Sequence, residues 1–248
     1  MFGTRIQRQA RRIAEMVVRP LAALGLTPNV ATILGLLLSA VTAAVLAAGN
    51  LRLGGALVLF AGIFDMVDGA LARVRDQKTA FGAFLDSTLD RYSEGLVLLG
   101  ILLYALGQTP SPARTWLVAL TYVAGLSSLM VSYTKARAES MGVEVKIGLV
   151  ARPERVLLLG VGLILGGSDW LLWIIAVLAA STTFTAVQRI AHVWGQLRRA
   201  SKAVAGADVS ADGHSGLHLA IQSRRAWFAP RVRGASTLDA VEESPPNA

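Results

Sequence analysis

Long apolar stretches, separated by charged residues, glycine or proline, recur along most of the chain. A helix of about 20 apolar residues crosses the ~30 Å hydrocarbon core of a bilayer. The pattern predicts six such helices, near residues 30–48, 51–73, 82–106, 114–134, 154–167 and 170–190. The fifth is short for a span and needs flanking side chains that reach the membrane surface. We therefore expect an all-α integral membrane protein with six transmembrane helices.

The two ends of the chain have different patterns. Between Thr4 and Leu24, arginines recur at helical spacing against apolar residues. This spacing indicates an amphipathic helix on the membrane surface, and a positively charged tail is the alternative. After about Ser201 the chain becomes rich in Ala, Ser, Gly and Asp without sustained periodicity. We expect an N-terminal surface helix (1–26), a six-helix domain (27–198) and a disordered tail (199–248).

Composition and charge agree with a membrane protein. Of the 248 residues, 54% are hydrophobic and only 16% are charged, which is fewer than a soluble domain carries. The net charge of +8 could indicate nucleic acid, but lysine and arginine gather before the first span and in the second and fourth loops. The positive-inside rule then places both termini in the cytoplasm, and we expect no nucleic-acid partner. The absence of cysteine excludes disulfides and thiolate metal sites.

Four aspartates lie inside the apolar helices, where each charge costs at least a few kcal/mol. Asp65 and Asp68 are three residues apart near the end of the second predicted helix, on one face. Asp86 and Asp90 are four residues apart near the start of the third. A short loop makes these two helices antiparallel neighbours, so that all four acids can converge near the cytoplasmic surface.

Four ionised carboxylates in a low dielectric repel one another unless protons or cations neutralise them. Oxygen-only donors suit Mg²⁺, Mn²⁺ or Ca²⁺, and Mg²⁺ is usually held by a few carboxylates together with substrate phosphates. A phosphate-bearing ligand is therefore implied, and Arg73 offers a planar fork for its oxygens. Gly69, Ala72 and Gly82 leave room beside the helix backbone, although tight helix packing is the alternative explanation of these small residues.

The acids and small residues together form one pattern, Asp65-x2-Asp68-Gly69-x2-Ala72-Arg73-x8-Gly82-x3-Asp86-x3-Asp90. At every fixed position it resembles the signature of the CDP-alcohol phosphotransferase family. The resemblance implies a homodimeric membrane enzyme of six helices. Such an enzyme cleaves the pyrophosphate of a CDP-linked alcohol, passes the phosphatidyl or similar group to an acceptor hydroxyl and releases CMP.

Roles for individual residues also follow from the resemblance alone. It implies that Mg²⁺ or Mn²⁺, with two ions expected, is bound by Asp65, Asp68, Asp86 and Asp90, and that Asp90 is the general base. It further implies that Asn29 in Thr27-Pro28-Asn29 lies near the nucleotide, and a helix N-cap is the alternative for this asparagine. The residues implied to bind the CDP-lipid are Asn29, Gly69, Ala72, Arg73 and Gly82.

A second group of basic residues, on the same predicted membrane face, points to the acceptor. Their segments are similar to the corresponding stretches of phosphatidylinositol-phosphate synthases, the subfamily whose acceptor is an inositol phosphate. Ordinary positive-inside residues are the alternative. The residues implied to bind the acceptor phosphate are Lys135, Arg137, Arg152, Arg155 and Arg189.

The leading hypothesis is transfer of a phosphatidyl group from CDP-diacylglycerol to inositol phosphate in the cell membrane, with the active site cytoplasmic. Another phosphorylated acceptor, such as glycerol 3-phosphate, is the close alternative. A divalent-cation channel or transporter is the alternative from another class, but the acids cluster at one surface beside Arg73 and Arg91 instead of lining a path across the bilayer. Glu94, one turn past Asp90, has no role in the resemblance, and we interpret it as a paired structural acid.

Overall fold

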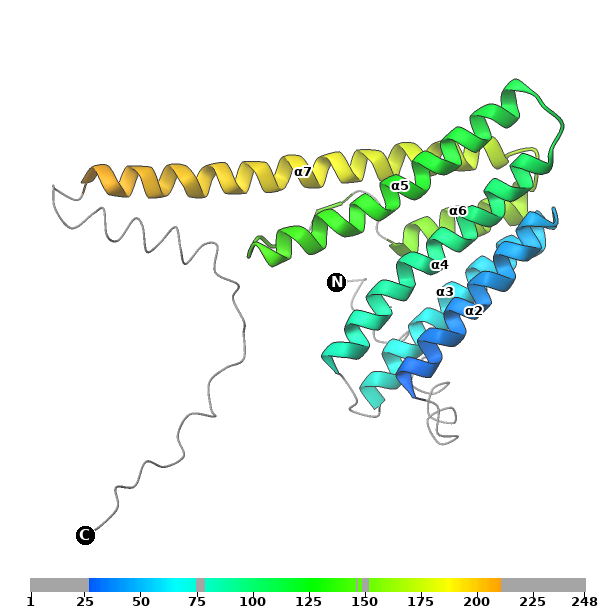
Figure 1. Cartoon of the computed structure of the whole chain (residues 1–248), viewed down its shortest axis with the longest axis horizontal. Coiled ribbons are helices and arrows are strands. Elements are labelled where there is room, and N and C mark those ends of the chain that lie inside the picture. Colours follow the sequence, from blue (N-terminus) through cyan, green and yellow to red (C-terminus); the bar gives the residue numbers. More distant parts are fainter. Residues whose placement is uncertain (1–26, 75–78, 146, 149–151, 211–248) are drawn as a thin grey trace, which may run out of the picture. The chain divides into compact units, whose positions relative to one another are not determined.

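We describe the protein from a computed structural model, which covers residues 27–74, 79–145, 147–148 and 152–210. The side chains of residues 66–70, 72–74 and 202–210 are outside this description. Within the described residues all regular structure is helical (Figure 1). The helices are α2 (Pro28–Ala47), α3 (Leu51–Val74), α4 (Ala80–Gly107), α5 (Pro112–Ser140), α6 (Arg152–Gly166) and α7 (Leu171–Ser210).

Each of the six predicted helices is present, but two of them run further than the apolar pattern indicates. α5 continues to Ser140 and α7 continues to Ser210, although the predicted spans end at 134 and 190. Charged residues at helical spacing end an apolar stretch without ending a helix, because the backbone hydrogen bonds continue. Residues 199–210, predicted as the start of a disordered tail, are therefore helical. The predicted surface helix (1–26) and the rest of the tail (211–248) lie outside the described residues.

The described residues divide into two compact units. The first unit takes its residues from Met1–Thr134 and Lys146–Ile190, and the second from Lys135–Val145 and Ala191–Ala248. The first unit holds a hydrophobic core to which several helices contribute. Leu46 of α2, Ile101 of α4, Leu163 of α6 and Ile175 of α7 are completely buried in it.

Local sequence explains where α2 and α4 begin. Thr27 is the N-cap of α2, its hydroxyl accepts a hydrogen bond from Val30 N at 3.4 Å, and proline follows as the first helical residue. Asn29 is inside the helix, so the alternative of an Asn29 N-cap is wrong. Thr79 caps α4 in the same way, and its hydroxyl accepts from Gly82 N at 2.9 Å. Both caps lie beside the aspartate-bearing ends of α3 and α4, at the end of the helices where the site forms.

Close helix packing brings the site-bearing helices together. α2 packs against α3 and α4, and α3 packs against α6. At Gly100 of α4, an added Cβ would lie 2.5 Å from the carbonyl oxygen of Ala43 on α2. At Gly55 of α3, an added Cβ would lie 2.7 Å from the carbonyl oxygen of Gly160 on α6. Small residues therefore set the distances between these backbones, as in other membrane helix pairs.

Gly100→Ala is expected to lower the stability of the detergent-solubilised protein by about 1–3 kcal/mol, because the new methyl group would overlap fixed backbone atoms of α2. Gly95→Ala on the same helix is the matched control, since a Cβ there meets nothing within 4 Å. That control should be neutral or stabilising by up to about 1 kcal/mol, because alanine favours helix. Thermal unfolding midpoints measure both changes, and equal midpoints for the two variants would contradict the close α2–α4 contact.

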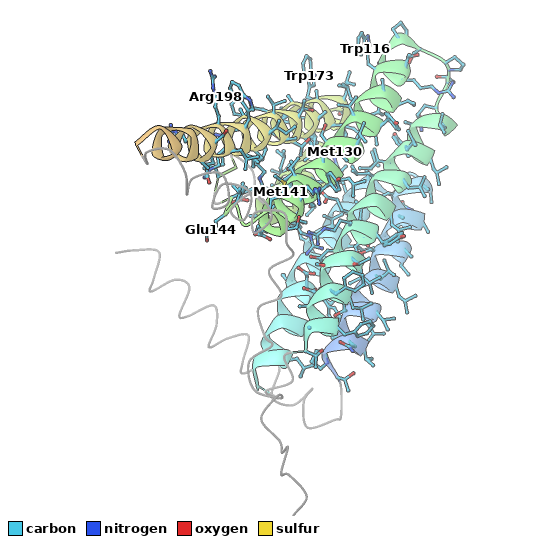
Figure 2. All side chains as sticks on the ribbon, turned by 60° about the vertical axis from the view of Figure 1, so that its left-hand side comes forward. Trp116, Met130, Met141, Glu144, Trp173 and Arg198 are labelled. Atoms are coloured by element: carbon cyan, nitrogen blue, oxygen red, sulfur yellow. The ribbon has the colours of Figure 1, made fainter. Side chains whose placement is uncertain are left out.

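The outside of the helices is apolar, as expected for contact with lipid. Of the described helices, α2, α5 and α7 (over Leu171–Ser201) are long and apolar enough to cross a membrane by length and composition. Large apolar side chains are exposed along the helices, and Trp116 and Trp173 point outward near the starts of α5 and α7 (Figure 2). α6 has 15 residues, which at ~1.5 Å each is shorter than the ~30 Å hydrocarbon core, as predicted for the fifth stretch.

Candidate active site

Three of the predicted acids converge between α3 and α4. One carboxylate oxygen from each of Asp65, Asp86 and Asp90 lies within 4.8 Å of the other two. Asp65 is near the end of α3, whereas Asp86 and Asp90 are one turn apart on α4 and so share a face. All three are half-buried. The predicted convergence is therefore confirmed for these three residues, while the side chain of Asp68 lies outside the described residues.

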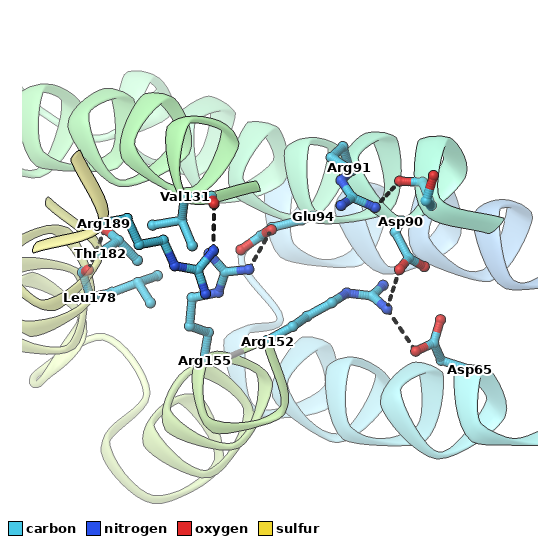
Figure 3. Close-up of polar contacts among 11 residues, drawn as sticks. Asp65, Asp90, Arg91, Glu94, Val131, Arg152, Arg155, Leu178, Thr182 and Arg189 are labelled. Carbon is cyan, nitrogen blue, oxygen red and sulfur yellow. Dashed lines mark hydrogen bonds and ion pairs between the residues drawn. The ribbon is translucent and has the colours of Figure 1, made fainter. Parts of the chain in front are cut away.

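Arg152, the first residue of α6, reaches into this group of acids (Figure 3). Its Nη1 lies 2.6 Å from Asp65 Oδ2 and 2.9 Å from Asp90 Oδ2, so that one nitrogen contacts carboxylates on two different helices. The Arg152 side chain is 29% exposed and that of Asp90 is 18% exposed. Because neither is fully solvated, the pairing is stronger than a surface salt bridge.

A second ion pair lies one helical turn further along α4. Glu94 Oε2 is 3.3 Å from Nη2 of Arg155, which follows Arg152 by three residues on α6 (Figure 3). The Arg155 side chain is only 5% exposed, and its Nε and Nη1 have no hydrogen-bond partner among the described residues. A charged group with unsatisfied N–H donors in a buried place is costly, which indicates that a further partner completes it. The interpretation of Glu94 as a paired acid is confirmed.

A cavity of about 480 Å³ connects these two ion pairs. Apolar side chains of α3, α4, α6 and α7 line most of it, and a few polar and charged side chains of α2, α3, α4 and α6 complete the lining. A mostly apolar cavity with convergent polar groups is typical of a binding site for an amphiphilic molecule. The charged residues in its lining are Asp65, Asp90, Glu94, Arg152 and Arg155.

The acids fit a hard divalent cation. Asp65, Asp86 and Asp90 offer only carboxylate oxygens, which are the donors that Mg²⁺ and Mn²⁺ take. Arg152 compensates one of the three negative charges, so the group retains an excess of negative charge in a partly desolvated place. The donor set and its charge therefore match a magnesium or manganese site.

Two of the residues predicted to bind the CDP-lipid lie side by side. A Cβ added to Gly82 would lie 3.2 Å from Oδ1 of Asn29 and 3.0 Å from Oγ1 of Thr79. The start of α4 thus approaches the start of α2 closely enough that only glycine fits without a shift. The other residues predicted to bind the donor, Gly69, Ala72 and Arg73, belong to α3, but the surroundings of their side-chain positions are outside this description.

The residues predicted to bind the acceptor phosphate are in two different units. Arg189 of α7 belongs to the first unit, where its Nη1 donates to Val131 O at 2.6 Å (Figure 3). Its Nε donates to Ile147 O at 3.1 Å. Lys135 and Arg137 belong to the second unit and are described only within it. Both are exposed on the last turns of α5, and Lys135 Nζ is 3.8 Å from Glu139 Oε1.

Comparison with known proteins identifies the family. The sequence model of the CDP-alcohol phosphatidyltransferase family matches residues 25–187, which is most of the chain. The chain belongs to this family of enzymes. The match contains α2 to α6, the first part of α7 up to residue 187, and every acid of the site. The cluster on α3 and α4 therefore lies in the part of the chain that defines the family. Membership of an enzyme family also decides against the channel or transporter alternative.

Individual members of the family resemble this enzyme closely. Archaetidylinositol phosphate synthase from Methanothermobacter thermautotrophicus is 40% identical over 194 residues, covering 77% of this chain and 95% of that protein. Phosphatidylinositol phosphate synthase from Mycobacterium tuberculosis is 39% identical over 191 residues, covering 74% and 86%. The crystal structure of the M. tuberculosis synthase with CDP-DAG bound has a TM-score of 0.67 at 37% identity, covering 74% of this chain and 94% of that chain. Its structure with manganese and citrate has a TM-score of 0.66 and covers 73% and 88%.

Sequence reasoning missed two features of the site. Arg152 was predicted to contact only an acceptor phosphate, but in the structure it contacts Asp65 and Asp90. Glu94 was given no place in the site, although it lines the cavity. The sequence carried a signal for Glu94, because Gly82, Asp86, Asp90 and Glu94 follow one another at intervals of four residues and so share one helix face.

Proposed function

We propose that this enzyme transfers the phosphatidyl group of CDP-diacylglycerol to inositol phosphate, giving phosphatidylinositol phosphate and CMP. The observation that carries the proposal is that the carboxylates of Asp65 and Asp90 line the same cavity as Arg152 and Arg155. Metal-binding acids and phosphate-binding cations are thus within reach of one bound molecule. The similarity to phosphatidylinositol phosphate synthases supports inositol phosphate as the acceptor.

In the proposed reaction the acceptor hydroxyl oxygen bonds to the phosphorus that carries the diacylglycerol. The bond between this phosphorus and the bridging oxygen breaks, and CMP leaves with the electron pair. Asp90 accepts the hydroxyl proton as general base. Magnesium or manganese, with two ions expected, supplies positive charge against the pyrophosphate. We propose as its ligands Asp65, Asp68, Asp86 and Asp90.

The donor and the acceptor are proposed to bind at different parts of the site. The close approach of Asn29 to Gly82 supports a narrow slot for the nucleotide at the starts of α2 and α4, to which we also assign Gly69, Ala72 and Arg73. The acceptor phosphate is proposed to bind the cations of α6 and α7 in the first unit. The incomplete hydrogen bonding of Arg155 supports this part of the proposal. The proposed acceptor residues are Arg152, Arg155 and Arg189, and from the sequence resemblance alone we also assign Lys135 and Arg137.

The membrane arrangement is part of the same proposal. We infer six membrane spans with both termini and the active site on the cytoplasmic side, because the basic segments lie on that side by the positive-inside rule. We further propose an N-terminal amphipathic helix at residues 1–26, a six-helix domain at 27–198 and a homodimer. A site near the cytoplasmic surface suits a lipid donor that meets a water-soluble acceptor.

An acceptor screen tests the proposal directly. Full-length enzyme in lipid vesicles is given CDP-diacylglycerol with inositol phosphate, glycerol 3-phosphate or free inositol, and lipid product and CMP are measured. Parallel reactions contain Mg²⁺, Mn²⁺ or a chelator, and CDP-archaeol replaces CDP-diacylglycerol in one series because one relative is named as an archaetidylinositol phosphate synthase.

We expect product from inositol phosphate in the presence of Mg²⁺ or Mn²⁺, and little from free inositol, which lacks the phosphate for the cations to bind. Product from glycerol 3-phosphate together with none from inositol phosphate would overturn the proposed acceptor. Full turnover in the chelator would overturn the metal site. Product from CDP-archaeol alone would replace the diacylglycerol donor and leave the acceptor intact.

A further inference from the structure

Arg152 occupies an unusual position for a residue expected to bind substrate. It is the first residue of α6, yet its guanidinium lies between carboxylates of α3 and α4 (Figure 3). A single nitrogen, Nη1, is within 3 Å of both Asp65 Oδ2 and Asp90 Oδ2, at 2.6 and 2.9 Å. One positively charged group bridging two carboxylates is the arrangement that a bound metal ion would also adopt.

The guanidinium and a divalent ion cannot share this place. At a few ångströms in a partly desolvated site, a single and a double positive charge repel each other strongly. A metal ion that binds Asp65 and Asp90 must therefore displace Arg152. Until it does, Arg152 lowers the repulsion between the two carboxylates and favours their present separation.

A displaced Arg152 has a defined alternative partner. It precedes Arg155 by three residues at the start of α6, so both side chains are on one face of the helix, and both line the cavity. Once separated from the acids, its charge is available to an anion in the cavity beside Arg155. The same side chain can thus serve the metal-free acids or a bound phosphate, but not both together.

We propose that Arg152 couples metal binding to acceptor binding: it is the counter-ion of Asp65 and Asp90 in the metal-free enzyme, and the metal releases it to the acceptor phosphate. This inference rests on the proposed function for the identity of the acceptor. Arg152 is then a positioning residue whose contacts change during the cycle. Because coupling between two sites is reciprocal, the acceptor should also tighten metal binding.

The experiment measures Mn²⁺ binding by electron paramagnetic resonance on the full-length enzyme in detergent. CDP-lipid is omitted, so that no turnover takes place, and titrations are run with and without inositol phosphate. Arg152→Gln removes the charge, and Arg152→Lys keeps a charge that can reach one carboxylate. Arg91→Gln is the matched control, because Arg91 lies next to Asp90 in the sequence but donates to the backbone oxygen of Ser87. Thermal unfolding without metal shows that each variant is folded.

For the wild type we expect inositol phosphate to tighten Mn²⁺ binding about fivefold or more. Arg152→Gln should bind Mn²⁺ roughly tenfold more tightly than the wild type without acceptor, and inositol phosphate should no longer change its affinity. Arg152→Lys should resemble the wild type without acceptor, since its charge still competes with the ion. Arg91→Gln should change Mn²⁺ affinity less than Arg152→Gln and should keep the response to inositol phosphate.

Unchanged or weaker Mn²⁺ binding by folded Arg152→Gln would overturn the counter-ion role, and a persisting response to inositol phosphate would overturn the coupling. If Arg152→Gln does not fold, wild-type Mn²⁺ affinity that is insensitive to both inositol phosphate and glycerol 3-phosphate overturns the coupling by itself. These outcomes differ from a failure of the proposed function. An enzyme that used another phosphorylated acceptor would still show tighter Mn²⁺ binding in Arg152→Gln, and that acceptor would then produce the coupling.

Discussion

Asp90→Asn is expected to lower kcat by roughly 10²- to 10⁴-fold while changing the affinity for the CDP-linked lipid by less than about threefold. Asparagine has nearly the shape of aspartate, and its side-chain oxygen can still accept from Arg152, which is 2.9 Å from the Asp90 carboxylate. It cannot take the proton of the acceptor hydroxyl, and it removes one negative charge from the metal-binding group. The substitution should therefore lower kcat and leave the affinity of the donor site for the CDP-linked lipid nearly unchanged.

CMP release under saturating substrates measures kcat for this variant, and thermal stabilisation by CDP-diacylglycerol in the absence of acceptor measures donor binding. Asp169→Asn is the matched control, because Asp169 is exposed in the turn between α6 and α7 and lies outside the cavity lining. It should keep wild-type kcat. An Asp90→Asn enzyme that kept wild-type turnover would contradict the role of Asp90 as general base. Loss of donor binding together with turnover would show that Asp90 acts mainly as a metal ligand at the donor site.

The sequence predicted the catalytic centre better than its surroundings because helix periodicity is a local property. Asp86 and Asp90 are four residues apart on one helix, so their common face follows from the sequence alone. Asp65 was predicted to join them because only a short stretch of sequence separates the two helices. The structure confirms the outcome, with the three carboxylates within 4.8 Å of one another.

The position of Arg152 was not predictable in the same way. It depends on how closely α6 approaches α3, and this distance is set where Gly55, near the start of α3, faces Gly160 of α6. No pattern within α6 shows which partner its first residue meets. For the same reason the ends of α5 and α7 were predicted too early, because hydropathy indicates where the bilayer ends but not where a helix ends.

The place of Glu94 could be predicted from the sequence only in part. Its spacing from Asp90 placed it on the acid-bearing face of α4, but its partner comes from α6 and depends on the tertiary structure. The ion pair with Arg155 shows why an acid is present at this depth: a buried arginine requires a negative charge close by. The cavity that both residues line then connects this pair to the aspartates.

Arg155→Ala is expected to raise the KM for inositol phosphate by roughly 10- to 100-fold, with kcat and the KM for the CDP-lipid changed much less. Arg155 is nearly completely buried, and its Nε and Nη1 lack partners among the described residues, so an incoming phosphate should gain charge-assisted hydrogen bonds from it. Steady-state kinetics with each substrate varied in turn separates the two KM values. Arg52→Ala is the control, because Arg52 is exposed on the first turn of α3. It should have the wild-type KM for inositol phosphate and for the CDP-lipid.

Loss of Arg155 also leaves Glu94 without its partner, and breaking a buried pair can cost about 3–5 kcal/mol of stability. The double variant Glu94→Gln/Arg155→Ala removes this unpaired charge. If Arg155 binds the acceptor phosphate, the double variant should be more stable than Arg155→Ala and should still have the high KM for inositol phosphate. A return of that KM to the wild-type value would mean that repulsion from Glu94, and not the loss of a phosphate contact, had weakened acceptor binding. Arg155 would then only neutralise Glu94, and the acceptor phosphate would have to bind elsewhere in the cavity.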